Sequence, residues 1–126
     1  MSEEPKKKLT LVLGASRNPE RVSYQAIKLL RQFDIPTIAI GQKSYEDHEL
    51  NIISGMPSDI GNIHTVTLYL GPLNQFEYYD YILSLKPVRI IFNPGSYNQE
   101  LAELAQKQGI ETIEGCMLVM IRNGQF

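Results

Sequence analysis

Residues 9–24 read LTLVLGASRNPERVSY, and this stretch decides how the chain folds. It begins with a short apolar run, Leu9 to Leu13, which predicts a strand buried on both faces. The run breaks at Gly14, and apolar residues then recur at helical spacing from Val22 to Phe33. A strand that ends at a glycine and continues as a helix is typical of a phosphate-binding turn, but it is equally a common structural corner.

Short apolar runs and helical spacing alternate along the rest of the chain. Including the first, the predicted strands are residues 9–13, 37–40, 65–70, 88–92 and 111–113. Helices are expected at 22–33, from Pro72 to Leu83, and around Leu101–Ala105 with Gly109 as the stop. The last apolar run favours a helix, with a strand as the alternative. Residues 42–51 are polar and aperiodic and predict a loop, and a small strand at Ile52 and Ile53 stays an open alternative.

Five main strands that alternate with helices, through connections too long for hairpins, favour parallel pairing with helices on both faces. We therefore expect an α/β fold, a Rossmann-like three-layer sandwich with a mainly parallel five-stranded sheet. In such folds ligands bind beyond the carboxyl ends of the strands, near the point where the strand order reverses. Functional residues should therefore lie in the loops that follow Leu13, Ile40, Leu70, Phe92 and Ile113.

The composition limits the kind of protein. The chain has 126 residues, 43% of them apolar, which suits one domain over 9–126 behind a polar tail over 1–8. Its net charge of −2 argues against nucleic-acid binding, and no apolar run nears the roughly 18–20 residues that span a membrane. Because the start also lacks a signal-peptide core, we expect a cytoplasmic protein. A single cysteine, Cys116, excludes an intramolecular disulfide and a cysteine-based zinc site.

The first of these loops has the features of an anion site. Gly14 allows a sharp turn and a close approach to a ligand, and Ala15 is small. Ser16 or Asn18 could cap the following helix, whose free N–H groups favour an anion. Two arginines bring positive charge to the same end: Arg17 and Arg21. The pattern G-A-S-R-N-P is not the dinucleotide pattern G-x-G-x-x-G, so a purely structural corner stays open.

The tip of the second strand reads Ile40, Gly41, Gln42, Lys43, Ser44. A Rossmann domain that binds NAD usually has Asp or Glu there for the ribose hydroxyls, and this chain has neither. Lys43 would suit a phosphate on the adenosine ribose, as in coenzyme A (CoA) or NADP. The alternative is a solvated loop lysine.

Several motifs together resemble one family, the small stand-alone CoA-binding proteins. The motifs are V-L-G-A-S-x-N-P-x-R at 12–21, GMPSDI at 55–60, N-P-G-S at 93–96 and E-G-C-x-L-V-M-I-R-x-G-Q-F at 114–126. These proteins are similar to the CoA-binding N-terminal domain of the succinyl-CoA synthetase α subunit. The resemblance extends from about Lys8 to Phe126, and the second-strand tip reads I-G-Q-K where relatives commonly have V-N-P-K.

The resemblance implies CoA or an acyl-CoA as the ligand. It places the pyrophosphate at Gly14, Ala15, Ser16 and Arg21, and the adenosine phosphate near Lys43. It places Leu70 and Gly71 beside the adenine or pantetheine, and residues 93–96 beside the pantetheine arm. The candidate cofactor-binding residues are thus Gly14, Ala15, Ser16, Arg17, Asn18, Arg21, Gly41, Lys43, Leu70, Gly71, Asn93, Pro94, Gly95, Ser96 and Cys116.

Catalytic residues are not evident in the sequence. Surface or packing roles are predicted for the histidines, the acidic loop cluster and a run of tyrosines: His48, His64, Glu46, Asp47, Glu49, Tyr78, Tyr79 and Tyr81. Cys116 directly follows the fifth strand, where a thiolate could form a mixed disulfide with CoA, but a lone cysteine is more often inert packing. Glu114 and Asn93 could orient a thioester carbonyl, without a paired nucleophile and base.

Two classes of function therefore stay open. The first is a binding module that holds CoA or an acyl-CoA without a reaction of its own. The second is an enzyme, either an NAD(P)-dependent oxidoreductase or a CoA-ligase fragment that acts with a partner chain. The missing acid at the second-strand tip and the missing nucleophile–base pair favour the first class. Whether the chain pairs with a partner protein or with copies of itself is left open.

Overall fold

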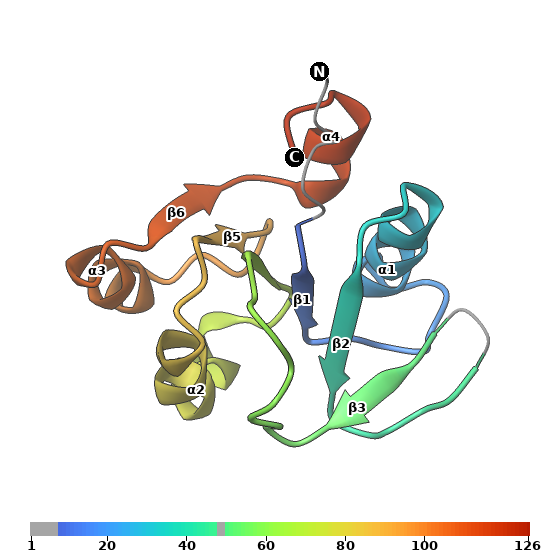
Figure 1. Ribbon diagram of the computed structural model, residues 1–126, viewed down its shortest axis with the longest axis horizontal. Helices are drawn as coiled ribbons and strands as arrows, with labels where there is room; N and C mark the ends of the chain where they lie inside the picture. Colours follow the sequence, from blue (N-terminus) through green and yellow to red (C-terminus); the bar gives the residue numbers. More distant parts are fainter. Residues whose placement is uncertain (1–7, 48–49) are drawn as a thin grey trace.

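The computed structural model describes residues 8–47 and 50–126, which form a sheet between two layers of helices (Figure 1). The strands of these residues are β1 (Thr10–Leu13), β2 (Thr37–Gly41), β3 (Ile52–Ser54), β4 (Thr65–Leu68), β5 (Arg89–Phe92) and β6 (Glu111–Glu114). The helices are α1 (Val22–Gln32), α2 (Tyr79–Ser84), α3 (Gln99–Lys107) and α4 (Met117–Arg122). All neighbouring strands pair in parallel, in the order β3-β2-β1-β4-β5-β6.

The predicted α/β, Rossmann-like class is confirmed, but the predicted number of strands is wrong. The described part of the chain forms six strands, because the short segment at Ile52 pairs in parallel with Ala39 of β2. The backbone of Ile52 also forms two hydrogen bonds with Tyr45, at 2.8 and 2.9 Å. Three residues are too few to show a period in the sequence, so tertiary pairing decides this strand.

The helices lie on the two faces of the sheet, each over its own apolar core. Residues of α2 and α3 pack on one face with Leu11 and Leu13, whereas α1 and α4 pack on the other face with Val12. This alternation follows from the pleat, which turns successive side chains of a strand to opposite faces. Every residue of β1, β4 and β5 is buried, as expected for a parallel sheet that is covered on both faces.

Two elements differ from the prediction by more than one residue at an end. β4 ends at Leu68 rather than at residue 70, and the predicted helix from Pro72 is two 3₁₀ turns, Pro72–Asn74 and Phe76–Tyr78, followed by the short α2. The buried side chain of Gln75 lies between the turns, and its amide donates to Leu70 O at 2.8 Å and to Ser96 O at 2.7 Å. These bonds fix the segment to the next loop, so it does not continue as one regular helix.

The other helix ends agree with the sequence. The Asn98 side chain accepts from Leu101 N at 3.2 Å and caps α3, and Gly109 follows that helix with a φ of 77°. The last apolar run forms α4, as predicted. Within the described residues, no helix has the length and apolar character needed to cross a membrane. His48 and Glu49 lie outside the described residues.

Candidate functional site

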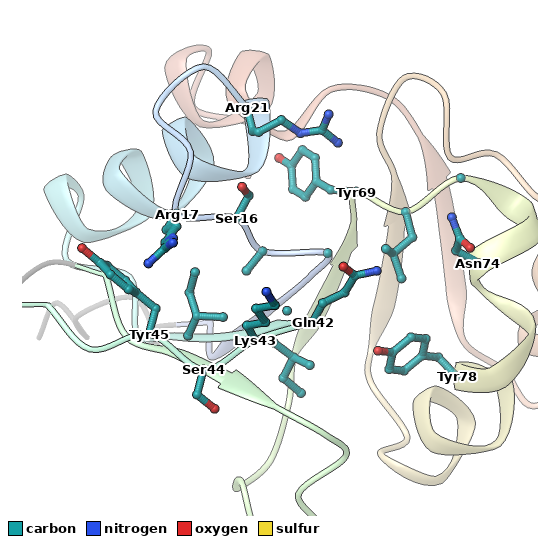
Figure 2. Close-up of a pocket in the computed structure, with 17 residues that line it drawn as sticks. Ser16, Arg17, Arg21, Gln42, Lys43, Ser44, Tyr45, Tyr69, Asn74 and Tyr78 are labelled. Carbon is teal, nitrogen blue, oxygen red and sulfur yellow. The ribbon is translucent and has the colours of Figure 1, made fainter.

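A pocket opens at the carboxyl end of the sheet, where the chain leaves β1 and β4 in opposite directions. The connection from β1 leads to α1 on one face, and the connection from β4 leads to α2 on the other face. Such a reversal leaves a crevice between the two connections. The pocket has a volume of about 470 Å³ and is formed by the loop after β1, the end of β2 with its following loop, and the segment after β4 (Figure 2).

The structure brings most of the predicted site residues together in this pocket. Those that line it are Gly14, Ala15, Ser16, Arg17, Arg21, Gly41, Lys43, Leu70 and Gly71. Those that do not line it are Asn18, Asn93, Pro94, Gly95, Ser96 and Cys116. The ligand contacts of both groups stay predictions, because lining a pocket is not binding.

The backbone of the loop after β1 packs closely on the end of β2. The amides of Gly14 and Ala15 both donate to Ile40 O, at 3.0 and 2.9 Å, so they are not free for a phosphate. Gly14 has a φ of 96°, a conformation that glycine adopts without strain. A Cβ at Gly41 would lie 2.4 Å from Ala15 O, so the second strand can approach this loop only with a glycine at that position.

The start of α1 is uncapped, which corrects one expectation. Ser16 Oγ accepts from Asn18 N at 3.0 Å, and Asn18 Oδ1 accepts from Glu20 N at 3.0 Å, so both side chains cap local turns and not the helix. The N-cap residue is Arg21, with no side-chain cap, and the first turn contains no acidic residue. The positive end of the α1 dipole is therefore available to an anion, next to the arginines of the loop.

The end of β2 contributes Lys43 and an aromatic ring. Lys43 is exposed, and Figure 2 shows it on the same side of the pocket as Gln42, Ser44 and Tyr45. The guanidinium carbon of Arg17 lies 5.3 Å from the centroid of the Tyr45 ring, within range of a cation–π contact. This pair joins the loop after β1 to the loop after β2 across one side of the pocket.

The segment after β4 forms the opposite wall, with Tyr69, Leu70, Asn74 and Tyr78. The hydroxyl of Tyr69 is buried and has no hydrogen-bond partner among the described residues. Burial raises the pKa of this hydroxyl further above its ordinary value, which already keeps it protonated at neutral pH. Figure 2 shows the Tyr69 side chain between the segment after β4 and the loop that carries Ser16 and Arg21.

The loop after β5 has an internal role in this structure. The Asn93 amide donates to Thr67 Oγ1 at 2.7 Å and to Leu68 O at 2.9 Å, and its Oδ1 accepts from Met117 N at 2.9 Å. Ser96 Oγ donates to Asn93 O at 2.7 Å. Both polar side chains are thus used to join β4, β5 and α4, whereas residues 94 and 95 are exposed.

Cys116 is half-buried and is the N-cap residue of α4. It packs against the core under α1 and α4, outside the pocket lining. The packing interpretation of Cys116 fits this position. Glu114, at the end of β6, is exposed.

The remaining titratable residues lie away from the pocket, with one exception. Tyr79 and Tyr81 donate to Glu100 Oε1 and to Pro57 O, at 3.0 and 2.6 Å, which fits packing roles. Tyr78 is the exception, because it lines the pocket. His64 lies next to Thr65 at the start of β4, at the amino ends of the strands and so opposite the pocket.

Sequence reasoning missed part of the lining: Ile40, Gln42, Ser44, Tyr45, Ile52, Tyr69, Asn74 and Tyr78. Three of these, at 42, 44 and 45, are sequence neighbours of Lys43, and adjacency to a predicted site residue was a usable signal. Tyr69 and Asn74 flank the predicted Leu70 and Gly71 in the same way. Tyr78 had no such signal, because its position depends on the 3₁₀ turns that replace the predicted helix.

The strand order and the pocket at its reversal point define an α/β protein of the Rossmann type. The sequence matches the family described as the CoA binding domain over residues 8–122, and the chain therefore belongs to that family. No match was found among curated proteins.

Solved structures support the fold. The crystal structure of an uncharacterized protein is 44% identical, with a TM-score of 0.91, and the match covers 97% of this chain and 100% of that one. A hypothetical protein from Pyrococcus horikoshii OT3 is 24% identical, with a TM-score of 0.80 and coverage of 92% and 82%. The dinucleotide-forming acetyl-coenzyme A synthetase 1 of Ca. Korarchaeum cryptofilum is 17% identical, with a TM-score of 0.69 over 86% of this chain and 25% of that one.

Proposed function

We propose that the protein binds CoA or an acyl-CoA in the pocket between β1 and β4, as a single binding unit over residues 9–126 without a reaction of its own. The observation that carries this proposal is the charge of the pocket. Its described lining contains three cations, Arg17, Arg21 and Lys43, and no Asp or Glu. Since the chain as a whole has a net charge of −2, positive charge gathers where a ligand with several phosphates would lie.

The parts of CoA are assigned by the chemistry of each wall. The diphosphate lies at Ser16, Arg17 and Arg21, where the uncapped start of α1 and the side chains together supply donors and positive charge. The ribose phosphate lies at Lys43, at the end of a strand that has no acid for a free ribose diol. The pantetheine arm leaves the pocket past Leu70 and Gly71 toward the exposed backbone of residues 94 and 95.

The absence of a reaction is supported by the side chains around the pocket. Its described lining contains no His, Cys, Asp or Glu that could act as a general base beside a hydroxyl nucleophile. Cys116 does not line the pocket and packs against the core under α1 and α4. A pocket with donors and cations but no base fits binding better than acyl or hydride transfer.

Ligand-dependent melting tests the proposal. A ligand that binds only the folded state adds about 2.7 kcal/mol of stability at 100 times its dissociation constant. For a chain of this length, each 1 kcal/mol raises the melting temperature by about 3–6 °C. CoA should therefore give a saturable rise of several degrees, NADP a smaller one because it shares only the phosphates and adenosine, and NAD the smallest.

The ranking of the three nucleotides decides between the classes of function. If NAD or NADP stabilises the protein more than CoA does, the CoA-binding proposal is wrong and an oxidoreductase takes its place. If the pure protein hydrolyses an acyl-CoA or transfers its acyl group, the proposed absence of a reaction is wrong.

A further inference from the structure

Strand pairing holds the backbone of Tyr45 at the edge of the pocket. Its backbone N–H donates to Ile52 O at 2.9 Å and its carbonyl accepts from Ile52 N at 2.8 Å, which attaches the residue to strand β3. The side chain is half-buried and packs on the core under α1. An aromatic ring anchored in this way at a nucleotide pocket is a stacking surface that is already in place before the ligand arrives.

The Arg17 guanidinium covers the free face of this ring. Its carbon lies 5.3 Å from the ring centroid, whereas a second planar ring between the two groups would need about 7 Å, two contacts of about 3.5 Å each. Arg17 is exposed and its side chain forms no hydrogen bond within residues 8–47 and 50–126. The arginine can therefore leave the ring at the cost of this cation–π contact, without breaking a hydrogen bond of the described residues.

We propose that the adenine ring of CoA stacks on Tyr45 in place of Arg17, and that the released guanidinium moves to the diphosphate. This inference rests on the proposed function. Tyr45 lies two residues after Lys43, the residue assigned to the ribose phosphate, so base and ribose lie at the same end of the pocket. Without ligand, the Arg17 guanidinium contacts the Tyr45 ring. With CoA bound, the adenine contacts the ring and the guanidinium contacts the diphosphate.

Substitution of Tyr45 tests the stacking. By calorimetry, Tyr45→Leu should weaken CoA and adenosine 3′,5′-bisphosphate by about tenfold or more, because stacking on an aromatic ring is lost. Binding of 4′-phosphopantetheine, which has no adenine, should not change. Tyr45→Phe keeps the ring and should bind all three ligands within about twofold of the native protein. Tyr97→Leu, which removes a half-exposed tyrosine outside the pocket, is the matched control.

Substitution of Arg17 tests the displacement. Arg17→Ala should weaken CoA by about tenfold, because a phosphate contact is lost, but it should not weaken adenosine, which has no phosphate and needs only the ring. If adenosine loses as much affinity as CoA does, the base stacks on the arginine itself and the displacement is wrong.

A spectroscopic measurement covers the case in which Tyr45→Leu does not fold. The NMR signals of one tyrosine ring, identified by their loss in Tyr45→Phe, should move upfield when adenosine 3′,5′-bisphosphate binds. The stacking proposal is wrong if Tyr45→Leu lowers the affinity for CoA and for 4′-phosphopantetheine equally. It is also wrong if the Tyr45 ring signals do not shift when adenosine 3′,5′-bisphosphate binds.

The same ligands separate this inference from the proposed function. If the native protein binds adenosine 3′,5′-bisphosphate in a Tyr45-dependent way but does not prefer CoA, the function is wrong and the stacking surface stands. If CoA binds and the Tyr45 variants change nothing, the function stands and the stacking surface is wrong. If neither ligand binds, both are wrong.

Discussion

Substitution of Ser16 by aspartate tests the placement of the diphosphate, because it adds one negative charge to the loop after β1. Ser16 Oγ accepts from Asn18 N, and an aspartate carboxylate at this position can accept the same bond, so the turn should survive. Ser16→Asp would, however, put a negative charge where the diphosphate is placed. We expect calorimetry to show CoA binding weakened by more than tenfold, about 1.4 kcal/mol.

Ser16→Asn provides the control for this change. Asparagine can accept the same hydrogen bond from Asn18 N, but it has no charge, so binding should fall much less than in Ser16→Asp. Unchanged affinity in a folded Ser16→Asp protein would remove the loop after β1 from the site.

Lys43 distinguishes the ribose phosphate from the rest of the ligand. If its ammonium contacts that phosphate, Lys43→Ala should weaken CoA by several-fold and leave dephospho-CoA nearly unchanged, because the second ligand lacks the group. Titration of both ligands against both proteins measures the difference. Equal losses for the two ligands would show that Lys43 acts only through its general charge.

At the residue scale, prediction from sequence worked where local chemistry decides the position. Arg17, Arg21 and Lys43 all line the pocket, because each follows a strand whose end the sequence shows clearly. Distant pairing was not predictable in this way. Tyr45 reaches the pocket through its bridge to Ile52, and the Asn93 side chain accepts from Met117 N, and neither contact is visible in a local pattern.

At the scale of elements, the contact between the end of β2 and the loop after β1 depends on Gly41. A Cβ there would lie 2.4 Å from Ala15 O, and a backbone oxygen cannot turn away as a side chain can. Gly41→Ala should therefore cost about 1–3 kcal/mol of unfolding free energy and also weaken CoA binding, because the loop must shift. Urea denaturation measures the first effect and calorimetry the second.

Gly71→Ala is the matched control from the opposite wall of the same pocket. Nothing lies within 4 Å of a Cβ at this position, and its φ of −65° suits alanine. Its unfolding free energy should stay near that of the native protein or rise slightly. Two equally destabilised alanine variants would contradict the close approach at Gly41.

The elements themselves were predictable where a helix or strand has its own period. The strands β1, β4 and β5 and the helices α1, α3 and α4 follow from local patterns and stops. The segment from Pro72 to Ser84 did not follow its pattern, because buried Gln75 bonds to two carbonyl groups in separate loops. Such bonds are set by the packed sheet and are absent from the local sequence.

At the scale of the whole molecule, we expect the unfolding free energy to depend on pH through the amino ends of the strands, opposite the pocket. His64 lies there with Lys8, Arg89 and Glu111, and burial, then Arg89 and Lys8, lower the pKa of its imidazole, while Glu111 opposes them. The folded state therefore favours the neutral ring. Between the lowered value and the unfolded value of about 6.5, the unfolded chain binds more protons, so the unfolding free energy falls as the pH decreases below about 6.5.

Thermal melting between pH 7.5 and pH 5 should show this loss in the native protein. The His64→Gln protein, which cannot gain the proton, should lose less stability over the same range. If both proteins lose the same amount, other groups cause the acid sensitivity and the charge of His64 has no part in it.

The overall topology was predictable only in part. Alternating strands and helices indicated a parallel sheet with covered faces, because connections of that length exclude hairpins. The strand order was not predicted, and the order places the reversal between β1 and β4, and with it the pocket. Strand order depends on long-range packing between the apolar faces of elements that are far apart in the sequence. The local pattern of a single sequence does not show which elements pack together.

The shared core of the first and last helices affects how the chain folds during synthesis. Ala26, Ile27 and Leu30 of α1 pack in one cluster with Met117, Leu118 and Ile121 of α4, which follow roughly 85 residues later. At about 5–20 residues per second, a ribosome needs about 4–17 s to make that intervening stretch. Throughout that interval the part of the apolar face of α1 that packs on α4 stays exposed in the growing chain.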